Sequence, residues 1–294
     1  METIPTKNML IRTKNDFWFS TDYTMNIYRG CSHGCIYCDS RSECYGIADF
    51  NQVRAKENAL LILSDNLRHK KIKGVIGTGA MSDPYNPLEQ KHQLTRQALE
   101  LFKTHGFGVA IATKSPLVAR DKDLLKTIQK HSPVIVKLTI TCAQDSLAKI
   151  IEPRVAPTSE RFTAIKELSE NAVFTGILLM PILPFINDTV DNIKKIIELA
   201  AQHGAQFIYP AFGVTLRDQQ RLFFYDQLDR HFPGIKKEYL KYFGNQYSCS
   251  SPNAKLLWTT FTRECQRHQL LYQMPDIVNQ YKIKHGGQQL SFLP

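Results

Sequence analysis

Residues 28–38 read YRGCSHGCIYC, which places three cysteines in one short loop with C-x3-C-x2-C spacing and a tyrosine directly before the last cysteine. The thiolates of Cys31, Cys35 and Cys38 can each bind one corner of a cubane iron–sulfur cluster. A cubane has four irons, so three cysteines leave one iron without a protein ligand. An open coordination position is where a metal centre performs chemistry. The spacing therefore favours a reactive 4Fe-4S cluster on this loop.

Other uses of the loop stay open at this point. A structural zinc site needs four closed ligands, and His33 or Cys44 could supply the fourth. Cys44 could equally complete a fully ligated electron-transfer cluster. A disulfide is disfavoured because the chain has seven cysteines, an odd number, and shows no secretory signal.

Composition and charge agree with an intracellular enzyme. A length of 294 residues with 43% hydrophobic content predicts one large domain, or one domain with an extension. The start of the chain lacks the apolar core of a signal peptide, and no apolar run is long enough to span a bilayer, so we expect a cytoplasmic protein without a membrane partner. The formal net charge of +10 suits an anionic partner such as nucleic acid, although a basic soluble surface gives the same number.

Hydrophobic periodicity predicts strands that alternate with helices. Strands are expected at residues 24–28, 74–78, 107–113, 134–141, 173–180 and 207–209, and one of the helices between them at 88–102. Six such units in series imply an α/β fold with a parallel sheet that curves into part of a βα barrel, a partial TIM-like (βα)6 barrel. The active site of such a barrel lies at the C-terminal ends of its strands. The cysteine loop follows the first expected strand, as this arrangement requires.

The cysteine spacing, with Tyr37 in place, resembles the signature of the radical S-adenosylmethionine (SAM) enzymes. The resemblance implies the six-unit partial barrel, a 4Fe-4S cluster and SAM as cofactors, and Tyr37 as part of the cofactor site. In that family the open iron chelates the amino and carboxylate groups of SAM. Reductive cleavage of SAM then gives an adenosyl radical that takes a hydrogen atom from the substrate. A reductase, flavodoxin or ferredoxin is the expected electron donor.

The ends of the expected strands carry further cofactor candidates. The second strand runs into Ser82 and Asp83, at the strand end that the family uses for the methionyl ammonium group; an ordinary Ser-Asp-Pro turn is the alternative. The third ends at Lys114, whose charge would pair with the SAM carboxylate. The fourth ends at Thr139 or Thr141, whose hydroxyl suits the ribose, although the β propensity of threonine explains either residue equally well.

A narrower resemblance, to the spore photoproduct lyase-like (DNA repair photolyase-like) branch of the superfamily, covers roughly residues 24–215. The stretches that carry it, beside the cysteine loop, are Ser82-Asp83-Pro84-Tyr85, Thr113-Lys114-Ser115, Glu152-Pro153-Arg154 and the Pro181-x-x-Pro184-x-x-Asn187-Asp188 loop. The resemblance makes Arg154 a cofactor-binding candidate, with a surface ion pair to Glu152 as the alternative.

This chain departs from that branch at one catalytic position. The lyase has a hydrogen-donating cysteine just ahead of the Ser-Asp pair, whereas this chain has Gly79-Ala80-Met81. Cys142 or Tyr85 could serve as the donor instead, so both are catalytic candidates. A buried small apolar residue is the alternative for Cys142.

The chain after residue 215 is expected to form two further parts. Residues 216–285 read as a helical extension packed on the 1–215 barrel, and their interleaved aromatic and basic side chains suit nucleic acid or simple helix packing. Residues 286–294 are expected to form a flexible tail. Within it, Gln289-Leu290-Ser291-Phe292-Leu293 resembles the peptide by which bacterial DNA-replication and repair proteins bind the sliding clamp, a possible partner.

Two classes of function follow from the sequence. One is a radical SAM enzyme that repairs or modifies nucleic acid, possibly as a carbon–carbon lyase, with tRNA or a peptide as the runner-up substrate. The other is a non-enzymatic, metal-stabilised nucleic-acid-binding protein. Lys114 and the other strand-end residues favour the enzyme, because a binding module has no use for them.

Overall fold

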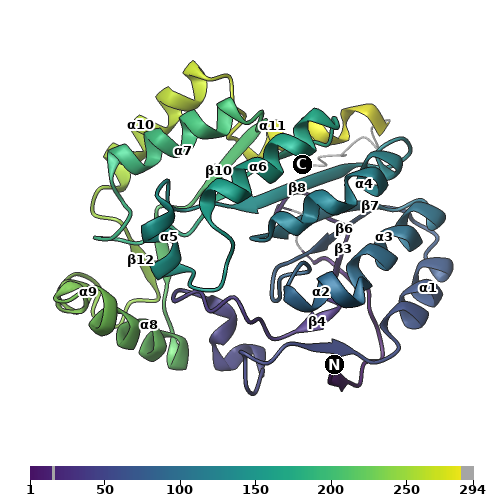
Figure 1. The fold of residues 1–294 in the computed structure, drawn as a ribbon, viewed down its shortest axis with the longest axis horizontal. Coiled ribbons are helices and arrows are strands. Elements are labelled where there is room, and N and C mark those ends of the chain that lie inside the picture. The colour runs from purple at the N-terminus through teal and green to yellow at the C-terminus, as the bar shows by residue number, and fades with distance from the viewer. Residues whose placement is uncertain (15–16, 286–294) are drawn as a thin grey trace, which may run out of the picture.

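A seven-stranded, mostly parallel sheet lies at the centre of the computed structural model, which describes residues 1–14 and 17–285 (Figure 1). The strand order is β10-β9-β8-β7-β6-β3-β2, in which β3 to β10 run parallel and β2 pairs antiparallel with β3. The strands are β2 (Ile11–Arg12), β3 (Tyr23–Met25), β6 (Val75–Thr78), β7 (Gly108–Thr113), β8 (Val134–Thr139), β9 (Thr175–Leu179) and β10 (Phe207–Pro210). All six strands expected from the sequence are present, and they neighbour one another in chain order.

Two small sheets flank the central one. The first contains β1 (Thr3–Ile4), β5 (Arg54–Lys56) and β4 (Tyr28–Arg29), in that order. Because β4 ends directly before the cysteine loop, this sheet fixes where the loop begins. The second is the antiparallel pair β11 (Gly213–Thr215) and β12 (Ser248–Ser250).

Helices connect the strands and follow them. They are α1 (Ala59–His69), α2 (Pro87–His92), α3 (Leu94–His105), α4 (Lys122–Ile128), α5 (Asp145–Ile151), α6 (Thr158–Glu170), α7 (Val190–Gln202), α8 (Asp218–His231), α9 (Ile235–Phe243), α10 (Ala254–Arg267) and α11 (Met274–Lys282). The single helix expected at 88–102 is two helices. Gln93 between them has a left-handed backbone, with φ of +51°, which ends α2 and starts α3.

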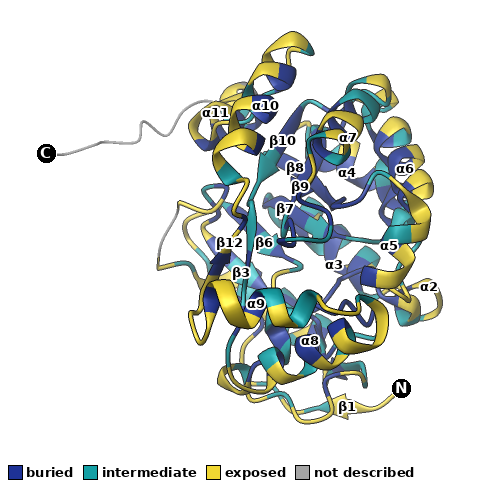
Figure 2. Ribbon diagram, turned by 90° about the vertical axis from the view of Figure 1, so that its left-hand side faces the viewer, coloured by how far each residue is buried: buried dark blue, intermediate teal, exposed yellow. Residues whose placement is uncertain are grey.

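Alternate residues of the strands face two different cores, as the period of two requires. Val109, Ile111, Val136 and Leu138 face the helices on the outer side of the sheet and belong to the largest apolar cluster. Their neighbours Ala110 and Ile135 face the inner side and belong to another cluster. Figure 2 shows the strands buried in the middle of the molecule and the outer surfaces of the helices exposed. The inner side is where the cavity described below lies.

The last long helix and a segment near the N-terminus close part of the inner side. Ile277 and Tyr281 of α11 pack in the same cluster as Ile135 of β8. The Tyr281 hydroxyl donates to the carbonyl of Phe19 at 2.5 Å, and the Phe19 ring lies 6.1 Å from that of Phe207 on β10. Contacts between residues more than 260 positions apart therefore cover this part of the inner side of the sheet.

Some expectations fall outside what the structure describes or tests. The tail at 286–294, with the clamp-like residues Gln289–Leu293, lies outside the described residues. The division into 1–215 and 216–285 stays a prediction. Among the described helices, none has the length and apolar character needed to cross a bilayer.

Candidate active site

The cysteine loop is held by backbone contacts to segments far away in sequence. Gly30 has φ of +81°, and a Cβ there would lie 2.2 Å from the carbonyl oxygen of Gln52, so only glycine fits. Cys31 N donates to the Phe50 carbonyl at 2.8 Å. Further along the loop, Ile36 N donates to a carbonyl at the end of α5 at 3.0 Å. The loop is therefore a fixed support for its thiols.

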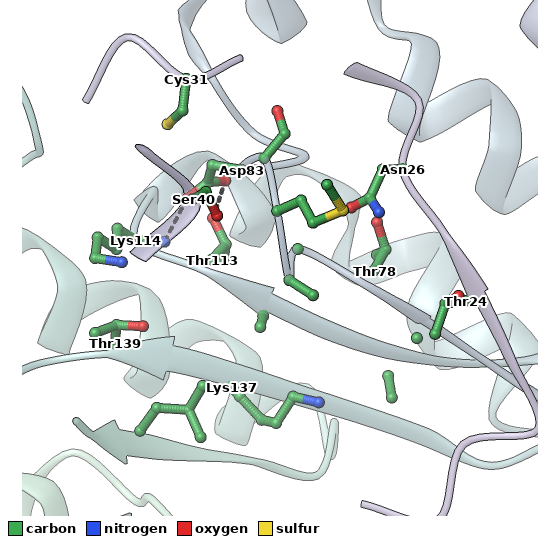
Figure 3. A pocket seen from close by; sticks show the side chains of 18 of the residues that line it. Thr24, Asn26, Cys31, Ser40, Thr78, Asp83, Thr113, Lys114, Lys137 and Thr139 are labelled. Carbon is green, nitrogen blue, oxygen red and sulfur yellow. Dashed lines mark hydrogen bonds between the residues drawn. The ribbon is translucent and has the colours of Figure 1, made fainter. Parts of the chain in front are cut away.

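All three cysteines of the loop line one cavity of about 340 Å³ at the C-terminal ends of β3, β6, β7 and β8. Figure 3 shows this cavity with Cys31, Asp83, Lys114, Thr139 and Lys137 around it. Among the described residues, no three His, Cys, Asp or Glu side chains stand close enough to share a single metal ion. A cubane cluster does not require such convergence, because each cysteine binds a different iron.

The neighbours of the thiols affect their ionisation in opposite ways. Burial opposes charge on His33, but Asp83, 3.5 Å from its Nδ1, and the thiol of Cys31 outweigh burial and raise the His33 pKa. Burial also disfavours the Cys31 thiolate, but His33 reverses this and lowers the Cys31 pKa. For Cys35 and Cys38, burial dominates and raises the pKa. A bound cation is therefore needed to hold all three as thiolates.

Ser82 and Asp83 connect the cysteine loop to the strand ends. The Ser82 hydroxyl donates to the Gly30 carbonyl at 2.6 Å. Asp83 accepts from the Thr113 hydroxyl at 2.6 Å and from the Lys114 backbone N–H at 2.8 Å. Both residues are buried and line the cavity, as expected. Their contacts give them a positioning role in addition to the ammonium binding that the sequence predicts.

Lys114 is a half-buried cation that lines the first cavity together with the three cysteines. Its Nζ lies 5.7 Å from the centre of the Tyr37 ring. Burial disfavours its charge, but Cys35 and Glu152 outweigh burial, so the Lys114 pKa is raised and the ammonium persists. A persistent positive charge in a cavity suits the carboxylate of a ligand.

A buried chain of hydrogen bonds holds the Tyr37 hydroxyl in place. The Tyr37 hydroxyl donates to Glu152, which also accepts from Arg161 at 2.7 Å. Arg161 in turn donates to the carbonyl of Thr139 at 2.7 Å. Glu152 and Arg161 are each 1% exposed, so Glu152 does not form the surface pair with Arg154 considered from the sequence.

A second cavity, of about 480 Å³, adjoins the first. Cys38, Ser40, Ala80 and Lys114 line both. From there the second cavity extends past Tyr37 to the pair of strands β11 and β12. The two cavities together offer a continuous space on either side of Lys114.

The structure does not bring three of the predicted site residues to either cavity. Tyr85 is buried and its hydroxyl donates to Asp121 at 3.1 Å. Cys142 is buried in an apolar cluster, where burial raises its pKa to about 11. Arg154 is exposed, with its guanidinium against Gly34 of the cysteine loop. Their assigned roles stay predictions.

Sequence reasoning did not single out two residues that line the first cavity, Lys137 and Asn26. Lys137 stands in the otherwise apolar run 134–138 of β8. A period of two places it on the same face as Thr139, which was a candidate. This alternation could have identified Lys137 as a residue on the cavity side of the strand. Asn26 directly follows β3, and only its position at a strand end could have indicated it.

Most aromatic residues of the 217–247 segment pack against one another. Buried together in one cluster are Phe224, Tyr225, Tyr239 and Phe243. Several basic residues also have internal partners: Arg217 pairs with Asp39 at 2.8 Å, and Lys236 with Asp229 at 2.5 Å. Helix packing therefore accounts for these residues. Exposed in the same segment are Lys237, Lys241, Tyr242 and Tyr247.

Comparison with known proteins identifies the class. The family model of the Radical SAM superfamily matches residues 25–208, more than half of the chain, and the chain belongs to this superfamily. The family uses a 4Fe-4S cluster and SAM. The three thiols on one cavity, the cation beside them and the adjoining second cavity fit both groups.

The chain is similar to several uncharacterized proteins. It is 37% identical over 169 residues to one from Methanocaldococcus jannaschii, a match that covers 56% of this chain and 62% of that protein. It is 27% identical over 241 residues to one from Mycobacterium tuberculosis, which covers 79% of this chain and 70% of that protein. The chain thus spans less than two thirds of the archaeal relative.

Solved structures share the fold at low sequence identity. Spore photoproduct lyase complexed with a dinucleoside spore photoproduct superposes with a TM-score of 0.65 and 14% identity, over 90% of this chain and 79% of that one. The radical SAM methyltransferase TsrM from Kitasatospora setae, with cobalamin and a [4Fe-4S] cluster bound, gives 0.57 and 11%, over 90% and 57%. These likenesses show the fold alone.

Proposed function

We propose that this chain uses Cys31, Cys35 and Cys38 to hold a 4Fe-4S cluster, cleaves SAM reductively at that site, and repairs or modifies nucleic acid. The observation that carries the proposal is that all three thiols and the Lys114 ammonium line one cavity at the C-terminal strand ends. When bound, the cluster and SAM supply a carbon radical that can take a hydrogen atom from a substrate.

The chain's own residues bind and orient in this proposal. Lys114 would hold the SAM carboxylate by its charge, and the Thr139 hydroxyl would bond the ribose; both residues line the cavity. Asp83 and Ser82 fix the strand end against the cysteine loop through the bonds described above. Tyr37, held by Glu152, lines the second cavity directly before Cys38 and would fix the position of that thiol. Burial of these groups keeps water from the reacting atoms.

The proposal also covers the domain organisation, the electron donor and the cellular compartment. We describe residues 1–215 as a partial (βα)6 barrel and 216–285 as a helical extension packed on it. A flavodoxin, a ferredoxin or a reductase would donate the electron. A labile cluster and unpaired thiols belong in a reducing compartment, which favours the cytoplasm.

Nucleic acid as the substrate has two supports. The fold is similar to that of spore photoproduct lyase, a protein solved with a dinucleoside lesion, and the formal net charge is +10. The similarity to spore photoproduct lyase is also the reason that the proposal includes a lyase reaction. The clamp-like residues Gln289–Leu293 would bring the enzyme to replicating DNA.

The test is SAM turnover in the presence of different polymers. Protein reconstituted without oxygen and given a reductant is assayed for 5′-deoxyadenosine with damaged duplex DNA, single-stranded DNA, tRNA and peptides. We expect a nucleic acid to stimulate turnover, with binding that weakens steeply with salt because phosphate contacts release counterions. Lys237→Ala with Lys241→Ala should make this salt dependence shallower. Stimulation by peptides alone, without binding to DNA or RNA at low salt, would contradict the nucleic-acid substrate.

A further inference from the structure

Lys137 is a buried lysine on the inner face of the central sheet. It is the fourth residue of β8, and its neighbours on the same face are Ile135 and Thr139. Its side chain is 2% exposed and lines the first cavity (Figure 3). Lysine is almost never buried without a partner, because removing an ammonium from water costs several kcal/mol.

No partner for this ammonium is present in the described part of the chain. Lys137 makes no hydrogen bond and no ion pair there, and the nearest recorded contact of its Nζ is the Phe19 ring, 4.2 Å to the centre. Asp83 is the one acidic residue among those that line the cavity, and Thr113 and the Lys114 backbone already bond its two oxygens. Burial alone lowers the Lys137 pKa to about 7, with no charged group to oppose it.

The strands beside Lys137 leave space around it. Among the cavity-lining residues of the neighbouring strands are Ala110 and Ala112 of β7 and Gly77 of β6, which have little or no side chain. Phe19 closes one side, held through its carbonyl by Tyr281. This part of the cavity lies deeper than the strand ends, because Lys137 comes two residues before the last residue of β8, whereas Lys114 follows the end of β7.

A further polar side chain without a hydrogen-bond partner lines the same cavity. Asn26 also lines the cavity, and its side-chain oxygen is buried without a hydrogen bond. Thr24 and Thr78 also line this cavity (Figure 3). Buried polar atoms without partners are rare in folded proteins and indicate a ligand or water that completes them.

A purely structural lysine is a poor explanation. Its contact with the Phe19 ring contributes on the order of 2 kcal/mol when desolvated, whereas removing an ammonium from water costs several kcal/mol. A methionine would fill the same volume without the cost. The lysine is therefore an unfavourable choice for the empty protein and a favourable one for a complex with an anion.

We propose that the inner end of this cavity is a substrate-binding subsite for an oxyanion, a carboxylate or a phosphate, and that Lys137 is its counter-charge. The amide of Asn26, which lines the same cavity, offers an additional hydrogen bond to such a ligand. The subsite deepens the proposed function, because it places the charged group of the substrate below the cofactor site. Its binding does not depend on turnover or on the identity of the polymer.

The test is calorimetric binding to the cluster-loaded protein with SAM bound and no reductant. Two pairs of probes differ only by the oxyanion: thymidine 5′-monophosphate against thymidine, and N-acetylglycine against N-acetylglycinamide. We expect the charged member of at least one pair to bind about tenfold more tightly than its uncharged counterpart, as one added charge-assisted hydrogen bond implies. The pair that discriminates identifies the oxyanion as a phosphate or a carboxylate.

Two variants make the outcome specific. Lys137→Met should abolish the discrimination and should melt at the same temperature as the wild type or higher. Lys122→Met, on the outer helix α4, should keep the discrimination. The proposal is overturned if neither pair discriminates, if the discrimination survives in Lys137→Met, or if Lys137→Met melts lower. Because no turnover is measured, failure here leaves the proposed radical reaction untouched, and failure of turnover leaves this subsite untouched.

Discussion

Glu152 and Arg161 form the most buried ion pair of the site, and Tyr37 depends on it. Burial raises the Glu152 pKa, but Arg161 and Lys114 reverse this and lower it, so the carboxylate is charged. Its two oxygens serve Tyr37 and Arg161 separately. The pair thereby fixes the aromatic residue that directly precedes Cys38.

The first prediction concerns this pair. Glu152→Gln should lower the free energy of unfolding by roughly 3–5 kcal/mol, because Arg161 would remain buried without its counter-charge. The matched control is Glu170→Gln, which removes one partner of an exposed pair with Lys166 and should change little. Urea denaturation of both variants measures the difference. Equal effects would show that the buried pair is not a special support for Tyr37.

The second prediction concerns Lys114. Lys114→Met should weaken SAM binding about ten- to a hundredfold, the loss expected for one hydrogen bond to a charged group, while the iron content stays the same. Equilibrium binding of SAM to the reconstituted variant measures the loss, with Lys122→Met as the control. Unchanged affinity would remove Lys114 from the cofactor site.

The third prediction is a pH dependence of stability that arises from Lys137. Its pKa falls from 10.5 to about 7 on folding, so between these values the unfolded chain binds the extra proton and stability rises with pH. The slope is at most about 1.4 kcal/mol per pH unit. Lys137→Met should therefore be more stable than the wild type near neutral pH, and the difference should shrink as pH rises. Parallel stability curves for the two proteins would contradict the depressed pKa.

At the scale of the elements, the end of β6 is the tightest point of the site. Gly79 has φ of +95°, and a Cβ there would lie 1.8 Å from the Ala112 carbonyl oxygen on β7. Gly106, which ends α3, has φ of +73° but nothing within 4 Å of such a Cβ. The two glycines share a left-handed backbone and differ in the space around them.

The fourth prediction uses this contrast. Gly106→Ala should cost only about 1–2 kcal/mol, the strain of a left-handed alanine. Gly79→Ala should cost more and should also weaken SAM binding, because β6 and β7 would have to separate at Asp83 and Lys114. Denaturation and SAM binding of both variants provide the check. Equal costs with unchanged SAM affinity would contradict this account of the strand end.

The sequence predicts the elements well where a local pattern determines them. The six parallel strands are found because short, mostly apolar and β-branched segments such as 134–138 are typical of buried strands. The break between α2 and α3 is missed because nothing in the sequence around Gln93 requires its left-handed backbone. The position of α11 is missed as well, because it depends on contacts such as Tyr281 with Phe19, which lie 262 residues apart.

For the whole molecule, the order of strand ends predicts part of the site. Cys31, Cys35, Cys38, Ser82, Asp83, Lys114 and Thr139 do line one cavity. Tyr85 follows the same strand end, but its ring turns to Asp121, a partner that no local pattern reveals. Lys137 lies in the middle of its strand, and a rule that considers only strand ends does not identify it. Position along a strand is thus readable from sequence, whereas the choice of side-chain partner is a tertiary property.

The central claim is that three cysteines bind a cluster whose open iron serves SAM. Its most direct measurement is the iron content and 5′-deoxyadenosine production of protein reconstituted without oxygen and given dithionite and SAM. The wild type should bind about four irons, as expected for one cubane, and should produce 5′-deoxyadenosine. Cys31→Ala, Cys35→Ala and Cys38→Ala should each lose both properties, while Cys44→Ala, whose side chain is exposed outside the cavity, should keep both. Loss of the cluster in Cys44→Ala, or a loaded wild type that never cleaves SAM, would contradict the account.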